Sequence, residues 1–267
     1  MSAPAVRTPR RKRFGQHFLH DPRIIGRILD ALAPAAADHL VEIGPGHGAL
    51  TLALLGTPCA SLDALEIDRD LAARLAPQLA VHPNARLHVV DALRFDFGAL
   101  AAARGAPLRI LGNLPYNIST PLLFHLLAQV HAVRDLHVML QREVVARICA
   151  TPGSESYGRL GVMLAPHLSA EWLFDVGPGA FRPPPRVTSA VLRLTVLDPP
   201  LFAVSPHYGA VVAAAFGQRR KTLRNALRTL LPEAALRAAG VDPGARPETL
   251  APAEFNTLAQ WLDRAGA

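Results

Sequence analysis

The sequence predicts an α/β protein with a doubly wound, mostly parallel sheet and a small C-terminal helical domain. Three observations lead to this fold class. Apolar runs typical of buried strands alternate with segments of helical spacing between residues 39 and 196. Glycine or a polar residue follows four of the runs, where open α/β sheets bind ligands. After Asp198 and two prolines, only helical spacing is left.

The elements follow in order from a helix that starts at Asp21 and Pro22, a typical cap followed by proline, and ends near Pro34. Strands are predicted next at His39–Ile43, Ala60–Ile67, Leu87–Val90 and Leu108–Leu111. Each precedes a predicted helix, at Ala49–Leu55, Asp70–Leu79, Phe97–Ala103 and Pro121–Val130. This alternation is the pattern of parallel strands joined by crossover helices.

The second half of the chain completes the sheet and then changes character. Strands are predicted at Leu136–Leu140, Glu171–Val176 and Val187–Thr195, with a helix at Arg142–Ala150. Helices alone follow at Tyr208–Phe216, Thr222–Leu230, Glu233–Ala239 and Ala253–Arg264. We therefore expect a basic flexible arm at residues 1–13, a sheet domain at residues 14–198 and a helical domain at residues 199–267.

The composition indicates what kind of partner the protein binds and in which compartment it is found. The chain of 267 residues holds 28 Lys and Arg against 21 Asp and Glu, a net charge of +7 that favours a polyanionic partner. Cys59 and Cys149 stand far apart with no ligand spacing around them, so neither disulfides nor a metal site is expected. No apolar run is long enough for a membrane span, and we expect a cytoplasmic protein. The basic arm also shares features with a mitochondrial presequence.

Three of the strand ends predict a nucleoside site. Gly44, Gly46 and Gly48 allow a tight turn that brings a ligand close to the backbone. Glu66, about 20 residues further on, suits ribose hydroxyls, and Asp91 suits an adenine amino group. The GxGxG spacing differs from the dinucleotide fingerprint GxGxxG and so favours S-adenosylmethionine over NAD. Each feature alone also fits an ordinary strand-to-helix turn.

The fourth strand end points to the chemistry. Asn113, Leu114 and Tyr116 offer a side-chain carbonyl, a backbone carbonyl and an aromatic ring within four residues, with Pro115 stiffening the turn. Two acceptors and a stacking ring are what an exocyclic adenine amine needs in order to attack a methyl group. The alternative is an Asn/Pro turn before the next helix.

At this point the chain resembles the ribosomal RNA adenine dimethyltransferase family, in particular its bacterial small-subunit branch. The stretches that carry the resemblance are Arg11–Leu19, Val41–Thr51, Glu66–Leu71, Gly112–Thr120, Gln141–Val145, Tyr157–Leu160, Ala180–Arg186, Thr188–Leu194 and Ala215–Asn225. The resemblance implies a seven-stranded, Rossmann-like class I methyltransferase fold with S-adenosyl-L-methionine as cofactor. It also implies dimethylation of two neighbouring adenosines in the 3′-terminal hairpin loop of small-subunit rRNA, within the 30S particle.

The resemblance also implies a role for individual residues. His17 and Leu19 close over the cofactor, Gly44, Gly46 and Glu66 hold its amino-acid and ribose parts, and Asp91 binds its adenine. Asn113 adjoins both cofactor and target base, and Leu114, Tyr116 and Phe181 complete the base pocket, with Phe181 as a second stacking face.

Basic residues predict an RNA-facing surface. Arg219, Arg220, Lys221, Arg224 and Arg228 place five cations in ten residues, and three of them recur at helical spacing on one face. Further candidates are Arg11, Lys12 and Arg13 in the arm and Arg182 and Arg186 beside Phe181. A solvated helix face is the structural alternative.

Other functions stay open at this stage. A large-subunit adenine methyltransferase of the antibiotic-resistance type shares the Asn-Leu-Pro-Tyr pocket, an RNA-binding assembly factor could keep the fold without turnover, and a small-molecule methyltransferase would not require the basic clusters. We expect a monomer, because no long exposed apolar stripe stands out.

Overall fold

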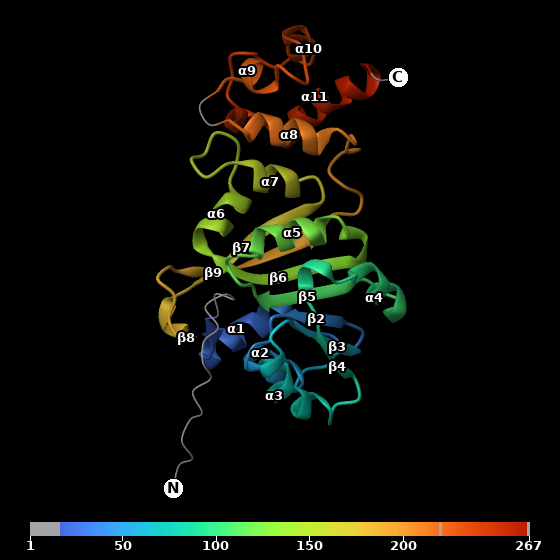
Figure 1. The fold of residues 1–267 in the computed structure, drawn as a ribbon, viewed down its shortest axis with the longest axis vertical. Coiled ribbons are helices and arrows are strands. Elements are labelled where there is room, and N and C mark those ends of the chain that lie inside the picture. The colour runs from blue at the N-terminus through green and yellow to red at the C-terminus, as the bar shows by residue number, and fades with distance from the viewer. Residues whose placement is uncertain (1–16, 219–220, 266–267) are drawn as a thin grey trace. The chain divides into compact units, whose positions relative to one another are not determined.

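The computed structural model describes residues 17–218 and 221–265, and its fold is drawn in Figure 1. A seven-stranded sheet has the order β4-β3-β2-β5-β6-β9-β7. Its strands are β2 (His39–Ile43), β3 (Ser61–Glu66), β4 (Ala85–Val89), β5 (Leu108–Asn113), β6 (Val133–Gln141), β7 (Leu168–Val176) and β9 (Ser189–Val196). The pairs β2–β3, β3–β4 and β2–β5 are parallel. The predicted α/β class and mostly parallel sheet are confirmed.

The strand order reverses beside β2. From β2 the chain runs outward through β3 to β4 and then returns to β5 on the other side of β2. In the register, Val41 stands between Asp63 of β3 and Ile110 of β5. Ligands of open α/β sheets bind beyond the carboxyl ends of the strands at such a reversal. The topology therefore places the ends of β2 and β5 next to each other, where the site is expected.

Side-chain caps explain where several crossover helices begin. The helices of this half are α1 (Pro22–Leu32), α2 (Ala49–Leu54), α3 (Arg69–Leu79), α4 (Phe97–Arg104) and α5 (Ser119–Leu127). Asp21, Asp68 and Asp96 cap α1, α3 and α4 by accepting hydrogen bonds from backbone N–H groups of the first turn. Figure 1 shows these helices flanking the strands, with α3 packed against β3 and β4.

A buried ion pair fixes the end of α1. Arg109 of β5 is 6% exposed and donates to the carboxylate of Asp38 over 2.6 Å. The same guanidinium donates to the carbonyl oxygen of Leu32 over 2.7 Å, at the last residue of α1. The two buried charges therefore neutralise each other, and the hydrogen bonds of Arg109 tie α1 to the sheet.

Two very short strands were not predicted. β1 (Phe18–Leu19) and β8 (Phe181–Arg182) form a separate antiparallel ribbon, in which Phe18 pairs with Arg182 and Leu19 with Phe181. The backbone N–H of His20 extends the contact by donating to the carbonyl oxygen of Ala180. The ribbon thus joins the start of the described chain to a segment about 160 residues later.

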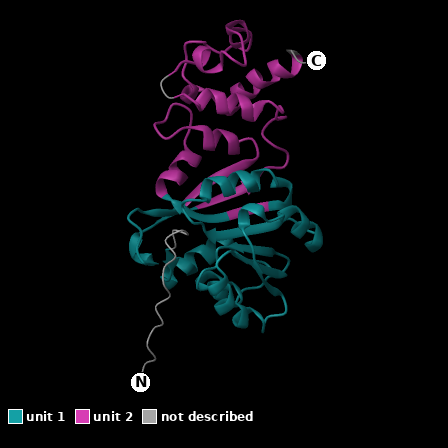
Figure 2. Ribbon diagram, viewed as in Figure 1, with its two compact units in different colours: residues 1–133, 137–141, 174–191 teal, residues 134–136, 142–173, 192–267 magenta. Residues whose placement is uncertain are grey.

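The chain divides into two compact units, coloured in Figure 2. Unit 1 comprises residues 1–133, 137–141 and 174–191, and unit 2 comprises residues 134–136, 142–173 and 192–267. This division differs from the expected boundary at residue 198, because unit 2 takes in α6 (Arg142–Cys149) and α7 (Arg159–Leu164). The short α7, which was not predicted, packs on α8 through Val162.

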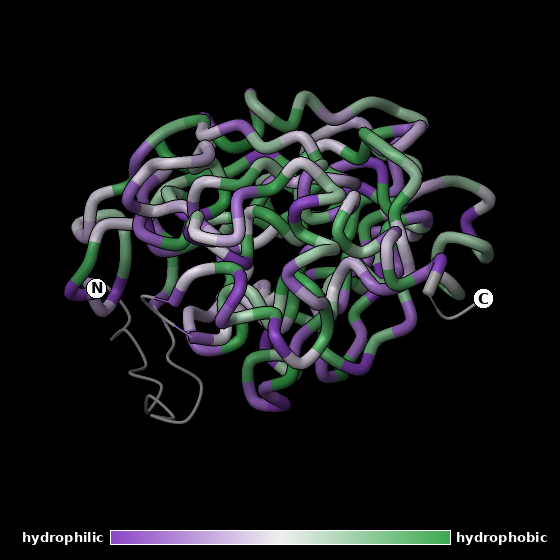
Figure 3. The backbone as a smooth tube through the Cα atoms, turned by 90° about the horizontal axis from the view of Figure 1, so that it is seen from above, coloured by the Kyte–Doolittle hydropathy of each residue, from purple (hydrophilic) through white to green (hydrophobic). Residues whose placement is uncertain are grey.

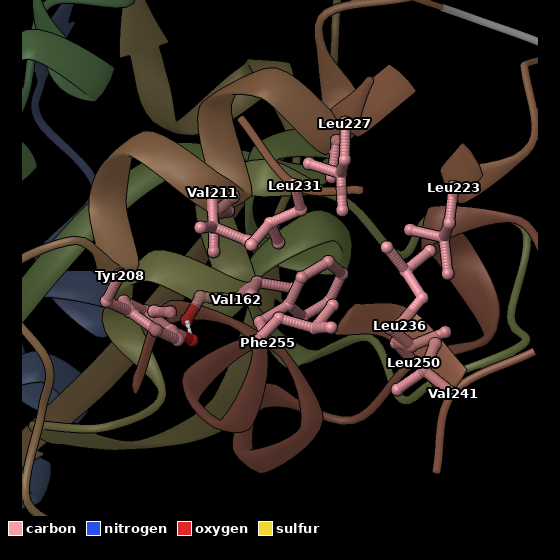
Figure 4. Packing of buried hydrophobic residues seen from close by; sticks show 14 of the residues in the cluster. Val162, Tyr208, Val211, Leu223, Leu227, Leu231, Leu236, Val241, Leu250 and Phe255 are labelled. Carbon is pink, nitrogen blue, oxygen red and sulfur yellow. Dashed lines mark hydrogen bonds between the residues drawn. The ribbon is translucent and has the colours of Figure 1, made fainter. Parts of the chain in front are cut away.

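Unit 2 has its own apolar core. Its remaining helices are α8 (Tyr208–Phe216), α9 (Leu223–Leu227), α10 (Glu233–Ala238) and α11 (Pro252–Ala265). Val162 and Tyr208 belong to the same cluster of buried residues as Val211, Leu236 and Phe255, which Figure 4 draws. The hydroxyl of Tyr208 donates to the carbonyl oxygen of Val162 over 2.8 Å. Residues before position 198 therefore belong to the same core as the C-terminal helices.

The alternation of hydrophobic and hydrophilic segments along the backbone can be followed in Figure 3. Within residues 17–218 and 221–265, none of the helices combines the length and the apolar character needed to cross a bilayer.

Candidate active site in unit 1

The glycines after β2 form the predicted tight turn. Gly44, Gly46 and Gly48 have φ values of 70°, 58° and 83°, a region in which other residues are strained. The N–H of Gly48 donates to the carbonyl oxygen of Pro45, and Gly48 is the N-cap of α2. This backbone conformation explains why glycine recurs here at every second position.

One of these glycines is also needed for packing against β1. A Cβ atom at Gly46 would lie 2.8 Å from the ring of Phe18. The Phe18 ring also packs on the His47 ring, with centroids 4.1 Å apart. Burial, with a smaller contribution from Arg74, lowers the pKa of His47. The first short strand therefore covers the glycine turn, a role that sequence reasoning gave only to the neighbours of Phe18.

Glu66 lies at the end of β3 and is tied to the same turn. One carboxylate oxygen accepts from the N–H of Gly46 over 3.0 Å and the other from the N–H of Asp68 over 2.9 Å. Glu66 is 5% exposed, and burial raises its pKa while the backbone hydrogen bonds lower it. The carboxylate that was predicted to bind ribose is thus held in a fixed orientation by backbone N–H groups.

A second carboxylate near the turn was not predicted. Glu42 lies within β2, is 2% exposed and accepts a hydrogen bond of 2.5 Å from the Thr51 hydroxyl. Desolvation raises the pKa of Glu42 to about 7, opposed by Thr51 and reinforced by the nearby Glu66. The sequence does carry a signal, because Glu42 is the one charged residue in a strand that is otherwise apolar after His39. Buried carboxylates of this kind are enriched in functional sites.

Asp91 follows β4, as predicted. It is the N-cap of the 3-10 turn η2 (Ala92–Arg94), and its Oδ1 accepts from the N–H of Leu93 over 3.0 Å. The hydrogen bond fixes the side-chain direction at the end of the strand.

The Asn113 amide is held by a distant part of the chain. Its Nδ2 donates to the carbonyl oxygen of His17 over 2.8 Å, which makes Oδ1 the acceptor end that is left. His17 is itself fixed, because its Nδ1 donates to the carbonyl oxygen of Pro183 over 2.8 Å. The N–H of Leu114 donates to the carbonyl oxygen of Met139 in β6, which anchors the loop to the sheet.

The Tyr116 side chain is held by contacts with Ser189 and His17. Its hydroxyl forms a 2.7 Å hydrogen bond with the hydroxyl of Ser189, and its ring centroid is 5.9 Å from that of His17. Burial raises the pKa of Tyr116, and the bond to Ser189 lowers it. The phenol is therefore neutral and held at its far end.

A cavity of about 270 Å³ joins these groups. Its lining includes most of the predicted cofactor and base residues, namely His17, Leu19, Gly44, Gly46, Glu66, Asp91, Asn113, Leu114 and Tyr116. Phe18, Glu42, His47 and Ile67 line it too, without having been predicted. The volume approaches the range of small-molecule sites, and apolar walls with a few carboxylates suit a cationic nucleoside.

Phe181 is not among the lining residues of this cavity. Its ring is 2% exposed and belongs to β8, where it is paired with Leu19. The structure therefore brings Asn113, Leu114 and Tyr116 together but does not place the predicted second stacking ring beside them.

The basic residues of unit 2 do not form the predicted single helical face. Thr222 has an extended conformation at the N-cap position of α9, without a side-chain hydrogen bond to the helix, and α9 runs only from Leu223 to Leu227. Lys221 therefore precedes the helix, Arg228 is its C-cap, and the predicted stacking is wrong. Arg224 is exposed and pairs with Glu233 over 3.6 Å. Arg11, Lys12, Arg13, Arg219 and Arg220 lie outside the described residues.

The basic residues near the ribbon are accessible. Arg182 and Arg186 are both exposed and stand on either side of the three consecutive prolines. Pro183 contacts His17, so this basic loop is linked to the wall of the cavity.

The sheet reversal, the glycine turn and the carboxylates at successive strand ends define the class as a nucleoside-binding α/β enzyme of the methyltransferase type. The profile of the family described as "Ribosomal RNA adenine dimethylase" matches residues 7–264. The chain belongs to this family. It is therefore a methyltransferase, and S-adenosylmethionine, the methyl donor of the family, is its cofactor, as predicted.

Individual relatives agree with this assignment. The chain is 53% identical to the "Ribosomal RNA small subunit methyltransferase A" of Methylococcus capsulatus, over 95% of this chain and 98% of the relative. It is 52% identical to the protein of that name from Pseudomonas aeruginosa, over 94% of each.

Solved structures share the fold. A dimethyladenosine transferase from Plasmodium falciparum matches with a TM-score of 0.80 at 21% identity, over 94% of this chain and 98% of that one. The 23S rRNA methyltransferase ErmE matches with a TM-score of 0.70 at 28% identity, over 92% and 99%.

Proposed function

We propose that this enzyme dimethylates the exocyclic 6-amino groups of two adjacent adenosines in the 3′-terminal hairpin loop of small-subunit rRNA. The names of relatives at 52–53% identity support small-subunit rRNA as the substrate. The observation that carries the chemistry is the Asn113 amide, which lines the cavity and whose Nδ2 donates to His17, so that Oδ1 is the acceptor proposed for the base. We further propose that the substrate is the pre-assembled 30S particle and that the protein acts as a cytoplasmic monomer.

The base pocket is proposed to work by orientation. Oδ1 of Asn113 and the carbonyl oxygen of Leu114 accept the two hydrogens of the adenine amine, which localises the nitrogen lone pair for attack. Tyr116 stacks on the base and holds its plane. Phe181 stays the proposed second face, although it has to move from its buried position to reach the base.

The cofactor residues are proposed to bind by position and charge. Gly44 and Gly46 let the backbone approach the amino-acid end, the Glu66 carboxylate accepts from ribose hydroxyls, and Asp91 accepts from the adenine amine. His17 and Leu19 close the cavity above them. S-adenosylmethionine supplies an electrophilic methyl group on a sulfonium, so the protein needs to add alignment rather than a strong base.

The proton balance fits a site without a strong base. Attack of the amine nitrogen would form a nitrogen–carbon bond while the bond between the methyl carbon and the sulfonium sulfur breaks, with the neutral thioether S-adenosylhomocysteine as leaving group. The acidic aminium would then lose a proton to a neighbouring acceptor or water. One N–H remains after the first transfer, so a pocket that accommodates one methyl group allows a second transfer.

Basic side chains are proposed to position the RNA. Arg182 and Arg186 are exposed in unit 1, and Lys221, Arg224 and Arg228 are exposed in unit 2. Arg11, Lys12, Arg13, Arg219 and Arg220, which lie outside the described residues, are proposed to add phosphate contacts. Each phosphate contact releases counterions, so binding should weaken steeply with salt. We propose residues 199–267 as the main RNA-binding part of the chain.

The test uses purified protein, labelled S-adenosylmethionine and under-methylated small or large ribosomal subunits, followed by nucleoside mass spectrometry. Dimethyladenosine from small subunits alone is the expected result. Label in large-subunit RNA would favour the activity that ErmE is named for, and binding to subunits without label would favour an assembly factor.

A variant links the result to the pocket. Asn113→Ala should lower the transfer rate by about 100-fold or more, because a positioned polar group is lost from the reacting centre. Gln78→Ala is the matched control, since it removes an exposed amide on α3 outside the cavity lining. Equal rates for Asn113→Ala and wild type would show that the amide does not orient the amine.

A further inference from the structure

Ser189 is a buried residue of a motif that has no role so far. It opens β9 within Thr188–Leu194 and has no exposed surface. Its hydroxyl lies 2.7 Å from the hydroxyl of Tyr116, which is 73 residues earlier in the chain. This contact connects the sheet directly to the far end of the ring that the base pocket uses.

The rest of the loop is held through its backbone. The N–H of Leu114 donates to Met139 of β6, and the carbonyl oxygen of Tyr116 accepts from the Ser119 hydroxyl over 3.2 Å at the start of α5. These bonds act on the main chain and not on the Tyr116 side chain. The hydrogen bond with Ser189 holds the ring at its tip, while the His17 ring packs beside it with centroids 5.9 Å apart.

The contact also separates two ways in which Tyr116 could act. A phenol pointing at the substrate would keep its hydroxyl available for hydrogen bonding. Here the hydroxyl is directed to a buried serine, while the ring itself lines the cavity. Tyr116 therefore offers a ring face, and a face is useful for stacking only if its plane is held.

We infer that Ser189 is a positioning residue for methyl transfer, which anchors the Tyr116 ring so that its face meets the target base. The inference rests on the proposed function of Tyr116. It requires that loss of the Ser189 hydroxyl acts through Tyr116 and not through a general loss of stability.

The kinetic test compares Ser189→Ala, Tyr116→Phe and the double variant. Each single variant should lower kcat on small subunits by about 5- to 10-fold, the effect of one hydrogen bond, with KM for the cofactor unchanged. The double variant should be no slower than either single one, because both remove the same bond. Ser61→Ala is the matched control, since Ser61 is 3% exposed and loses a comparable bond of 2.9 Å to His39.

Three outcomes would overturn the inference. They are a kcat of Ser189→Ala equal to that of wild type, additive losses in the double variant, or a loss in Tyr116→Phe far greater than in Ser189→Ala. The last would mean that the phenol itself contacts the substrate.

A second measurement does not depend on activity. The chain has three tyrosines, and the hydroxyls of Tyr157 and Tyr208 donate to the carbonyl oxygens of Leu250 and Val162. In NMR spectra of protein with ¹³C-labelled tyrosine, Ser189→Ala should shift the Tyr116 signal and speed its ring flips, with the other two signals as references. An unchanged Tyr116 signal would overturn the inference. If wild-type protein methylates neither ribosomal subunit, the proposed function fails, and the NMR result still decides whether Ser189 holds the ring.

Discussion

Glu42 should make the stability of the cofactor-free protein fall as pH rises. Its carboxyl is 2% exposed in β2, and burial raises its pKa from the ordinary 4.5 to about 7. Between these two pH values the folded state binds a proton that the unfolded state has released. The free energy of unfolding therefore decreases through this window and levels off above pH 7.

The size of the effect follows from the same two values. A difference between 4.5 and about 7, at about 1.4 kcal/mol per pH unit, corresponds to about 3 kcal/mol. Glu42→Gln keeps an acceptor for the Thr51 hydroxyl but cannot ionise. The variant should match wild type near pH 4.5 and exceed its free energy of unfolding by up to about 3 kcal/mol at pH 8.

The assay is urea denaturation with linear extrapolation at several pH values from 4.5 to 8, without cofactor. Because both proteins carry the same histidines, the difference between them isolates Glu42. Glu155→Gln serves as the control for loss of an exposed carboxylate. A stability difference between Glu42→Gln and wild type that stays constant over this pH range would refute the reasoning.

Three substitutions test the packing around the site. Gly112→Ala should cost more than about 3 kcal/mol or prevent folding, because its Cβ would lie 2.4 Å from a carbonyl oxygen of β2; an unchanged urea midpoint would contradict this. Arg109→Ala should lower the free energy of unfolding by about 3 to 5 kcal/mol, because Asp38 loses its buried guanidinium partner. A loss below about 1 kcal/mol in the same assay would contradict a stabilising role of this ion pair. Gly46→Ala should raise the cofactor Kd in calorimetry by about 10-fold or more, with the circular dichroism spectrum unchanged. The reason is that the new Cβ atom would meet the Phe18 ring and that a φ of 58° is strained for alanine. Cofactor binding as tight as in wild type would disprove the need for glycine.

Much of the sheet could be predicted because its strands are short runs of mostly apolar residues. β2 was predicted at its observed bounds, since its apolar run is closed by the Gly44 turn. Glu66 and Asn113 were likewise predicted at strand ends, and they are the last residues of β3 and β5. In such strands, burial and turn chemistry act over a few neighbouring residues, and the sequence records both.

The features that were missed depend on contacts between distant segments. β1 and β8 have two residues each, too few for any periodicity, and exist because they pair with each other. The predicted helix at Thr222–Leu230 is shorter in the structure and has its C-cap at Arg228. The N–H groups of Leu230 and Leu231 then both donate to the carbonyl oxygen of Leu227, which turns the backbone out of the helix. Phe181 has the residue type of a stacking ring, but in the structure it is buried in β8, which pairs with a strand about 160 residues earlier in the chain.

The tie between Asn113 and His17 has a consequence for which bases the site accepts. Because Nδ2 of Asn113 donates to the carbonyl oxygen of His17 and the residue lines the cavity, Oδ1 is the atom proposed to meet the base. On the proposed role of Asn113, a base that carries a carbonyl at position 6, such as guanine or hypoxanthine, would set oxygen against oxygen there. The amide cannot turn over to accommodate it without breaking its bond to His17. Discrimination between an amino and a keto base is thus set by a residue at the edge of the first short strand, which need not touch the base itself.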